Sequence, residues 1–339
     1  FEVSFGKDFQ KKFRLITMTG RYSVDQPRWD QSTFYGRLRH FASITDPRKI
    51  FASPETLRKS KMLLEQYKKN QEPKGTRLED LYRAQAYYGS AFHPDTGELQ
   101  NLAGRMCANV YGGTILCGAM MIWYKSASAV IFWQWANQSF NALVNYTNRN
   151  AKSPMSNQDL LIAYSSAVTG ALGVALGLKY YFARKAYSVT VQRLVPFIAV
   201  AIANAINIPL VRQNELINGL IVTDENDNEV GRSKLAAYKA ISLVVISRNV
   251  IVAPSMLLTP IIVDLFCKFR WFARNLHMVN IPTQLTLTFI LFGAMVPVGC
   301  ALYPQKNSLN VETLRRYEPK IYQTIQKRST QHVYFNKGL

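Results

Sequence analysis

Acidic side chains are missing from the long apolar runs that fill this sequence after residue 100. The carboxylates of that region lie only between or after the runs, at Asp159, Glu215, Asp224, Glu225, Asp227, Glu229, Asp264, Glu312 and Glu318. A soluble domain has no reason to keep this rule, whereas a carboxylate at the centre of a bilayer costs roughly 2.5 to 3.5 kcal/mol on insertion scales. We therefore predict that residues 101–304 form a transmembrane domain.

Cysteine and histidine are also scarce. The cysteines are Cys107, Cys117, Cys267 and Cys300, and the histidines are His40, His93, His277 and His332. They show no CxxC spacing and no cluster of metal ligands, so the sequence indicates small buried thiols and excludes a disulfide framework. We expect no metal, no cofactor and no catalytic residues, and hence a protein that is not an enzyme.

One loop resembles a calcium-binding loop but lacks two of its essential residues. Residues 223–231, TDENDNEVG, carry oxygen ligands at alternate positions, namely Asp224, Asn226 and Asn228. Glu229 stands where such a loop needs glycine, and Leu235 stands where it needs a bidentate glutamate. We therefore expect no calcium site in this loop.

Positive charge is in excess, with 41 lysines and arginines against 21 aspartates and glutamates and a formal net charge of +20. Such an excess is typical of proteins that bind nucleic acid or an anionic membrane surface. The first hundred residues are charged throughout, and the remainder alternates apolar runs with short basic loops. We therefore expect membrane lipids as a partner and no nucleic acid.

The chain divides by composition into four parts. We expect residues 1–24 to be a basic, disordered extension and residues 25–100 to be a soluble helical domain. The transmembrane domain at residues 101–304 follows, and residues 305–339 are expected to form a polar C-terminal tail.

Two helices are predicted within the soluble domain. Ser53 followed by proline predicts the start of a helix that runs to about Asn70. Thr76 with Glu79 predicts a capping box at the start of a second helix, Arg77–Ser90. Basic residues along both helices indicate a solvated face, and contact with anionic lipid headgroups is the alternative.

Five apolar runs have the length needed to cross a hydrocarbon core of about 30 Å, or nearly so. They are Gly104–Tyr124, Leu160–Phe182, Leu194–Val211, Leu235–Val263 and Leu285–Tyr303. A sixth segment, Ala127–Tyr146, is too polar for an ordinary lipid-facing span, so it is either an enclosed helix or an interfacial one. We therefore predict an all-α fold, a multi-pass transmembrane helical bundle of about five spans with an N-terminal polar helical domain.

Glycines within these runs predict where helices pack closely. Gly112 and Gly113 lie in the first run, while Gly170, Gly173 and Gly177 follow one another at three- and four-residue spacing in the next. Such spacing places small residues on one face of a helix and lets a neighbouring helix approach.

The segment from residue 133 to 149, WQWANQSFNALVNYTNR, joins aromatic bulk to a series of amides that includes Asn137, Gln138 and Asn141. An amide in hydrocarbon loses its hydrogen bonds to water, so it is tolerated only against other helices or in a wet cavity. Two interpretations follow. The amides line a polar path for a solute, or they join helices to one another.

Further polar residues occur inside the later runs. Asn204 and Asn207 lie in the third run, and Arg248 lies near the middle of the fourth, six residues before Pro254. Proline removes an amide donor, so we expect a helix break that exposes carbonyl groups beside the guanidinium. Arg248 then either binds the carboxylate of a small solute, or snorkels and bonds to the carbonyls at the bend. The candidate substrate-binding residues are Arg248, Asn137, Gln138, Asn141, Asn204 and Asn207.

Several ordered segments resemble one known family. They are PRWDQSTF (27–34), TDPRKIF (45–51), SAFHPDTGE (90–98), FWQWANQSFNALVNYTNR (132–149), INIPLVRQNEL (206–216), TDENDNEVG (223–231), YPQK (303–306) and VYFNKGL (333–339). Together they are similar to the sideroflexins, a family of mitochondrial membrane proteins. The resemblance covers roughly residues 25–339.

This resemblance implies a multi-pass protein of the mitochondrial inner membrane that carries serine, and other small neutral amino acids, into mitochondria for one-carbon metabolism. It brings no agreed substrate site that could be transferred to residues of this chain. Because the apolar runs lack carboxylates, the usual proton relay is missing, and we expect facilitated or exchange transport. The alternatives are a factor in iron or haem homeostasis, and a membrane scaffold without transport activity.

Overall fold

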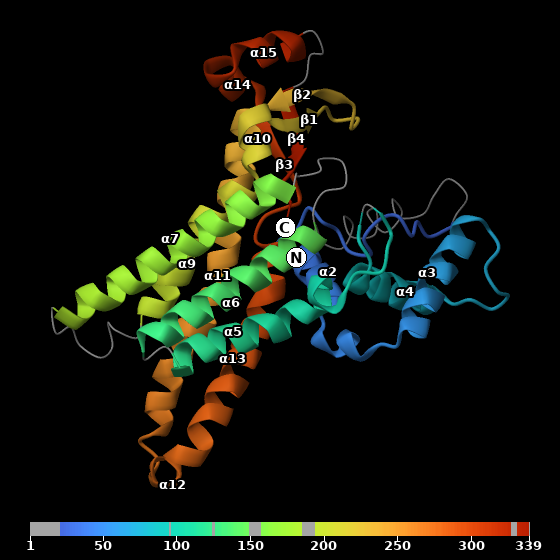
Figure 1. Ribbon diagram of the computed structural model, residues 1–339. Coiled ribbons are helices and arrows are strands. Elements are labelled where there is room, and N and C mark those ends of the chain that lie inside the picture. The colour runs from blue at the N-terminus through green and yellow to red at the C-terminus, as the bar shows by residue number, and fades with distance from the viewer. Residues whose placement is uncertain are drawn as a thin grey trace, which may run out of the picture. The chain divides into compact units, whose positions relative to one another are not determined.

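The structure is a computed structural model that describes residues 21–94, 96–123, 126–148, 157–184, 194–326 and 331–338 (Figure 1). It divides into two compact units, Phe1–Val110 and Tyr111–Leu339. The sequence places this division about ten residues earlier, at the end of the polar region. Residues 1–20 of the predicted extension lie outside the described residues.

The first unit is helical. Its elements are α2 (Phe34–Ile44), the 3-10 helix η1 (Pro47–Phe51), α3 (Pro54–Lys68), α4 (Leu78–Ala91) and the 3-10 turns η2 (Leu102–Gly104) and η3 (Met106–Ala108). The predicted start of α3 is confirmed, because the Ser53 hydroxyl accepts the backbone N–H of Thr56 at 3.1 Å. Leu57, Ala91 and Phe92 form a small buried cluster between α3 and the end of α4.

The predicted capping box of the second helix is wrong by one residue. Helix α4 begins at Leu78, and the Asp80 carboxylate accepts the backbone N–H of Arg77 at 3.1 Å. The hydroxyl of Thr76 instead donates to the carbonyl of Pro73 at 2.7 Å. Two acidic residues stand side by side in this first turn, and the sequence pattern selected the one that does not make the bond.

Residues at the end of the predicted extension also belong to the packed part of the first unit. Tyr22 lies within the predicted extension, yet its hydroxyl donates to the Gln85 side chain at 2.6 Å. Its ring packs edge-on against Tyr82 at 5.0 Å. Burial of this phenol raises the pKa of Tyr22 to about 12. The packed fold of the first unit therefore includes residues from 21 onward.

The second unit contains the long helices. They are α5 (Asn109–Trp123), α6 (Ala127–Thr147), α7 (Asn157–Arg184), α9 (Val195–Val211), α11 (Lys234–Phe266) and α13 (Leu276–Ala301), with short helices α10 (Gln213–Asn218) and α12 (Arg270–Arg274). Each predicted span thus corresponds to a helix. Three segments among the described residues are long and apolar enough to cross a membrane: Met106–Trp123, Lys234–Phe266 and Leu276–Ala301. The shorter α9 is apolar over 17 residues.

The long helices of the second unit contact one another in a closed order among the described residues. Helix α6 packs on α7, α7 on α9, α9 on α11 and α11 on α13. Helix α5 completes the ring. On one side Trp123 stacks on Trp133 of α6, with the ring centroids 5.7 Å apart. On the other side Tyr111 contacts Phe289 of α13, with the ring centroids 5.6 Å apart. Side chains on the inner faces of α6, α9 and α11 therefore point into a shared interior.

Glycine allows three of the close approaches that the sequence predicts. A Cβ on Gly112 would lie 2.1 Å from Phe140 of α6, and one on Gly113 would lie 2.1 Å from Phe292 of α13. Gly170 is close to Ile206 of α9, with a Cβ distance of 3.0 Å. The prediction is wrong for Gly173 and Gly177, where an added Cβ would meet nothing within 4 Å.

The buried face of α7 is an alanine stripe. Ala167, Ala171 and Ala175 are all almost fully buried and recur at four-residue spacing. Ala175 packs with Val130 of α6 and Ala199 of α9. The two exposed glycines lie on a different face because each is displaced by two residues from a buried alanine, which is about half a turn of the helix.

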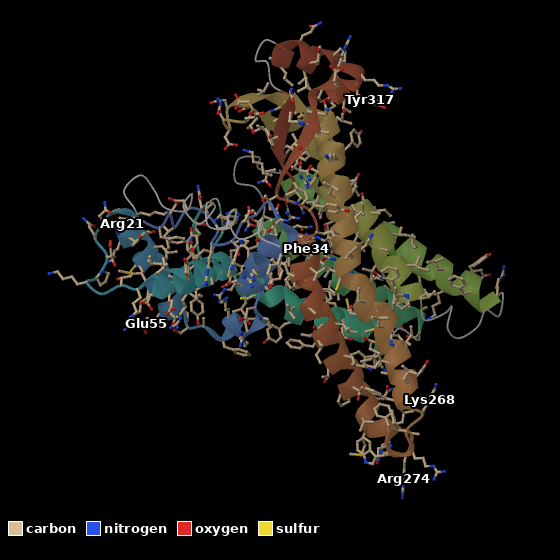
Figure 2. The ribbon with its side chains drawn as sticks, turned by 180° about the vertical axis from the view of Figure 1, so that it is seen from behind. Arg21, Phe34, Glu55, Lys268, Arg274 and Tyr317 are labelled. Atoms are coloured by element: carbon tan, nitrogen blue, oxygen red, sulfur yellow. The ribbon has the colours of Figure 1, made fainter. Side chains whose placement is uncertain are left out.

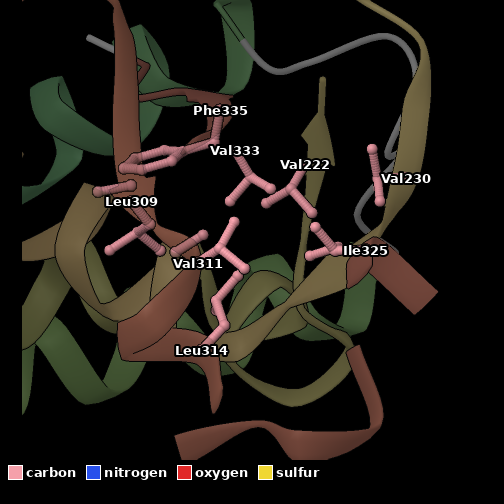
Figure 3. Packing of buried hydrophobic residues seen from close by; sticks show 10 residues of the cluster. Val222, Val230, Leu309, Val311, Leu314, Ile325, Val333 and Phe335 are labelled. Atoms are coloured by element: carbon pink, nitrogen blue, oxygen red, sulfur yellow. The ribbon is translucent and has the colours of Figure 1, made fainter. Parts of the chain in front are cut away.

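A small sheet subdomain completes the second unit. Its elements are β1 (Leu220–Thr223), β2 (Glu229–Ser233), β3 (Lys306–Asn310), β4 (His332–Asn336), α14 (Val311–Tyr317) and α15 (Pro319–Gln326). The strands are antiparallel and ordered β2-β1-β4-β3. The core joins both halves of the sheet, with Val222, Leu314 and Val333 fully buried at its centre (Figure 3). The predicted polar tail therefore contains two strands and two helices, which pack against the β1–β2 hairpin.

The loop that resembles a calcium site is the β1–β2 turn. The Asp224 carboxylate accepts the backbone N–H groups of Asn226 and Asn228, both at 2.9 Å, and the Asn228 side chain at 3.1 Å. Asp227 adopts φ +63°, the left-handed conformation that tight turns need. The acidic and amide side chains of this loop therefore hold a hairpin.

The subdomain also holds the start of α11. Strand β2 runs directly into this helix, and the Ser233 hydroxyl accepts the backbone N–H of Ala236 at 3.0 Å. The Glu318 carboxylate accepts the N–H groups of Lys234 and Leu235 at 2.7 and 3.2 Å. These bonds satisfy the first donors of a helix, which have no partner within the helix itself.

We predict that Gly299→Ala destabilises the contact between α13 and α11. The new Cβ would lie 2.2 Å from Ile251 and 3.0 Å from the backbone oxygen of Ser247, which cannot move without displacing α11. Overpacking of this kind costs about 1 to 3 kcal/mol. Thermal unfolding of the purified protein in detergent, followed by tryptophan fluorescence, should show a lower melting temperature.

The matched control is Gly173→Ala. It makes the same chemical change within a helix, at a position where the Cβ meets nothing within 4 Å. Removing a glycine from a helix interior stabilises it by up to about 1 kcal/mol, so this variant should melt at or above the wild-type temperature. Equal melting temperatures for the two variants would contradict the close approach at Gly299.

Candidate functional site

Helix α6 has one amide face and one aromatic face. Gln134, Asn137 and Gln138 are buried, and the same face continues one and two turns later with Asn141 and Asn145. Residues at this three- and four-residue spacing share one side of a helix. The opposite side is exposed and apolar, with Ile131, Phe132, Trp135, Leu143 and Tyr146 all more than 40% exposed. The helix therefore turns its amides to the interior and its aromatic rings outward.

Hydrogen bonds between side chains join the interior faces of three helices. The Asn207 amide of α9 donates to the Gln138 oxygen of α6 at 3.1 Å. Asn204 of α9 donates to the Asn249 oxygen of α11 at 2.9 Å. Arg248 of α11 donates to the Asn145 oxygen of α6 at 3.3 Å. Each pair among α6, α9 and α11 is thus linked once, and we call these six residues the amide triangle.

The guanidinium of Arg248 has unused capacity for hydrogen bonds. Its bond to Asn145 is the one hydrogen bond it makes within the described residues, although a guanidinium carries five N–H donors. No described carboxylate lies within ion-pair distance of it. An arginine in these surroundings can bind an anionic group with two parallel hydrogen bonds.

The predicted break beside Arg248 is wrong. Helix α11 is continuous from Lys234 to Phe266, with Pro254 and Pro260 inside it. Each proline removes one backbone hydrogen bond, but in a bundle the neighbouring helices hold such a helix together. The guanidinium therefore faces side-chain amides across the bundle, and not an unwound stretch of backbone.

Two buried amide nitrogens of α6, one of them in the triangle, have no hydrogen-bond partner in the described part of the chain. They are Nδ2 of Asn137 and Nε2 of Gln138. A buried donor without a partner costs about 1 to 3 kcal/mol, so such groups are rare unless a ligand or water satisfies them. Asn141 is only partly buried, and none of the side-chain hydrogen bonds described here involves it. The amide face of α6 thus offers donors to a polar solute.

The structure brings the six predicted candidates onto three neighbouring helices. Gln138 contacts Asn207 directly, while Arg248 and Asn204 take part through Asn145 and Asn249. These two partner asparagines, Asn145 and Asn249, are not among the candidates predicted from the sequence. Asn145 could have been found from its seven-residue spacing to Gln138, and Asn249 from its position next to Arg248. Their pairing across helices has no signal in a single sequence.

The comparisons with known proteins give one family. The model of the sideroflexins matches residues 23–339. Sideroflexin-2 of Homo sapiens is 47% identical over 321 residues, which cover 94% of this chain and 98% of that protein. Sideroflexin-2 of Drosophila melanogaster is 46% identical over 320 residues, 93% of this chain and 97% of that protein. The chain belongs to the sideroflexin family. Sideroflexin-1 of Mus musculus is 45% identical over 319 residues, 94% of this chain and 97% of that protein, and no solved structure matches.

Family membership confirms the resemblance drawn from the sequence motifs. Together with the three apolar spans, it makes this sideroflexin a membrane protein. Its match begins at residue 23, close to Tyr22, the first of the packed residues described above.

The C-terminal residues of this sideroflexin reach the vicinity of the amide triangle. The Arg212 guanidinium at the end of α9 donates to the Lys337 carbonyl at 2.8 Å and pairs with Glu215. Arg212 also lies within electrostatic range of Arg248. Lys337 is fully buried. Its ammonium group interacts electrostatically with the Cys300 thiol, and so does the Arg248 guanidinium. Cations placed at the C-terminal ends of α9 and α13 are stabilised by the helix dipoles.

Metal ligands and thiols do not gather in the described part of the chain. No group of three or more histidine, cysteine or acidic side chains is close enough there to hold a metal ion. The four cysteines are free thiols, of which Cys107 and Cys117 are buried and Cys267 and Cys300 partly exposed.

We predict that Asn207→Leu destabilises the bundle because it leaves the Gln138 oxygen buried without its donor. A lost partner of this kind costs about 1 to 3 kcal/mol. The double variant with Gln138→Leu should regain part of the loss, with a coupling energy of about 0.6 to 1.7 kcal/mol as for polar pairs in other membrane bundles. A double-mutant cycle on unfolding in detergent measures it.

Asn141→Leu is the control for this cycle. It also replaces an amide of α6, but Asn141 is partly exposed and makes none of the hydrogen bonds described above. Its effect should stay within about 0.5 kcal/mol. A coupling energy of zero between Gln138 and Asn207 would show that the pair does not hold α6 to α9.

Proposed function

We propose that this sideroflexin carries small neutral amino acids, serine foremost, across the mitochondrial inner membrane by facilitated or exchange transport, and so supplies one-carbon metabolism. Membership of a family of transporter type supports the proposal. The observation that carries it is Arg248, whose partly buried guanidinium reaches from α11 to α6, makes one bond to Asn145 and has no described carboxylate beside it.

The chemistry of the interior suits a zwitterion. The solute's carboxylate would take the unused donors of Arg248, which form strong, charge-assisted bonds. Its ammonium group needs acceptors, and the amide oxygens along α6 provide them. The hydroxyl oxygen of serine can accept from Asn137 Nδ2 or Gln138 Nε2, the two buried donors without a described partner. Asn141, Asn204 and Asn207 complete the proposed binding set.

The same arrangement favours transport without proton coupling. Proton-driven carriers usually pass protons through carboxylates inside the membrane. Within α11, the one acidic residue is Asp264, four turns beyond Arg248 and close to the end of the helix. Neither α6 nor α9 contains an acidic residue.

We predict that Arg248→Met strongly reduces serine uptake while the protein still folds. Hydrogen bonds to charged groups contribute about 1.5 to 3 kcal/mol, so uptake efficiency should fall roughly 10- to 100-fold. Arg248→Lys keeps the charge but loses the planar fork, and should retain only part of the activity. Uptake of labelled serine by proteoliposomes, at matched protein content, measures both variants.

Arg232→Met is the matched control for this experiment, because Arg232 is exposed on β2 and outside the amide triangle. It should leave uptake unchanged. If Arg248→Met lowers the melting temperature and the folded yield together with uptake, Arg248 serves folding, and a scaffold without transport activity becomes the better explanation. Full uptake by Arg248→Met would refute the proposed site.

We also predict that serine uptake does not require a pH gradient, because the amide triangle contains no group that releases a proton near neutral pH. Proteoliposomes with equal pH inside and outside should take up labelled serine and exchange it for unlabelled serine. Dissipating an imposed gradient with an ionophore should not change the initial rate. A strict requirement for the gradient would contradict uncoupled transport.

A further inference from the structure

The turn between α11 and α13 carries an exposed basic and aromatic surface. It includes the short helix α12 and the residues that flank it on both sides. Figure 2 shows Lys268 and Arg274 at the far end of the α11–α13 pair, beyond the other helices of the second unit. We call residues 268–278 the hairpin tip.

Three fixed cations lie close together in the hairpin tip. Lys268, Arg270 and Arg274 are exposed, and none of the ion pairs described for this chain includes them. The nearest acidic residue in the sequence is Asp264 on α11, and the next one after the tip is Glu312. The tip therefore presents a concentrated positive charge.

Large apolar side chains stand between these cations. Phe269 is 66% exposed, Trp271 69% and Met278 67%. Phe272 has the opposite orientation, since it is buried and packs edge-on against Phe266 at 5.6 Å. Phe272 thus packs inside the turn, while the side chains of Phe269, Trp271 and Met278 are exposed.

The position of the tip decides what can cover this surface. It joins two helices that are each long and apolar enough to cross a membrane, so it lies where hydrocarbon gives way to headgroups. Tryptophan and phenylalanine side chains suit this boundary, and lysine and arginine extend their charges from it towards the headgroups. An acidic protein surface would match the charges, but it would leave the exposed rings without an apolar partner.

We propose that the hairpin tip binds anionic phospholipid headgroups. Phe269, Trp271 and Met278 enter the acyl chain boundary, and Lys268, Arg270 and Arg274 hold the phosphate groups. The two arginines bind phosphate oxygens through paired N–H donors, and the lysine acts as a point charge. This surface is separate from the amide triangle, so the proposal does not depend on transport of any solute.

Native mass spectrometry of the full chain in detergent tests the proposal. Phosphatidylglycerol and phosphatidylcholine with the same acyl chains are the two probes. The wild-type protein should retain phosphatidylglycerol and release phosphatidylcholine. The triple variant Lys268→Gln, Arg270→Gln, Arg274→Gln should weaken retention roughly a hundredfold, because each basic residue contributes about fivefold near an anionic surface.

The matched control is the triple variant Arg232→Gln, Lys234→Gln, Arg316→Gln. These cations are exposed on β2, at the first residue of α11 and on α14, so the control removes the same charge elsewhere. It should bind phosphatidylglycerol as the wild type does. Both triple variants should melt within a few degrees of the wild type, since the altered side chains are exposed.

A second measurement tests the aromatic part of the surface. In bilayers with brominated acyl chains, the difference in fluorescence between wild type and Trp271→Phe reports on Trp271 alone. It should be quenched by bromine near the headgroups and much less by bromine at the bilayer centre. Absence of quenching would contradict insertion of the tip.

Four outcomes would overturn the proposal. Equal retention of both lipids would show that the headgroup charge is not recognised. Equal losses in the two triple variants would show that only total charge matters. Displacement of phosphatidylglycerol by inorganic phosphate alone would assign the tip to free anions. Capture of an acidic peptide in preference to phosphatidylglycerol would assign it to a protein partner.

Discussion

Amide hydrogen bonds within the helix ring are the constraint on which the second unit depends. A polar side chain that leaves water must find its partners inside the protein, because hydrocarbon offers none. The Gln138–Asn207, Asn204–Asn249 and Arg248–Asn145 bonds meet this requirement for α6, α9 and α11 at once. The same bonds fix the rotation of each helix about its axis, so the exposed aromatic face of α6 follows from the placement of its amides.

Apolar packing has a different role at the two ends of this unit. Around the ring, contacts are made by small residues such as Gly113 and Ala175, which bring helix backbones close together. In the sheet subdomain, branched and aromatic side chains from β1, β4 and α14 form a core like that of a water-soluble protein. Helix α11 belongs to both, because Ala236 and Ala240 lie in that core and Ser247 lies against α13.

The helices were predictable from local sequence because their signals are local. The cap at Ser53 and the acid-free apolar runs each depend on residues within a few turns. The sheet was not predictable in this way, since β1 and β4 meet through residues 111 positions apart, at Thr223 and Tyr334. Such pairing depends on the closure of a long chain and leaves no periodic pattern in four or five residues.

The candidate site was predictable in residue type but not in pairing. Amides in apolar runs must be enclosed, and Gln138 and Asn207, which were selected on this ground, are both buried. The rule that proline breaks a helix failed at Pro254, because it describes an isolated helix and this one is held by α9 and α13. Asn145 became recognisable as the partner of Arg248 only when two helices 103 residues apart in sequence were seen together.

The hydrogen bonds of Glu318 and Ser233 to the first turn of α11 have a mechanical consequence. Over its 33 residues the helix is a continuous rod of about 50 Å, clamped at one end by backbone hydrogen bonds to the sheet subdomain. Because of these bonds, α11 cannot rotate about its axis or shift along it without moving the sheet subdomain. If α11 tilts, β2 and the residues around Glu318 must therefore move with its first turn, so the sheet subdomain and the helix ring are mechanically coupled.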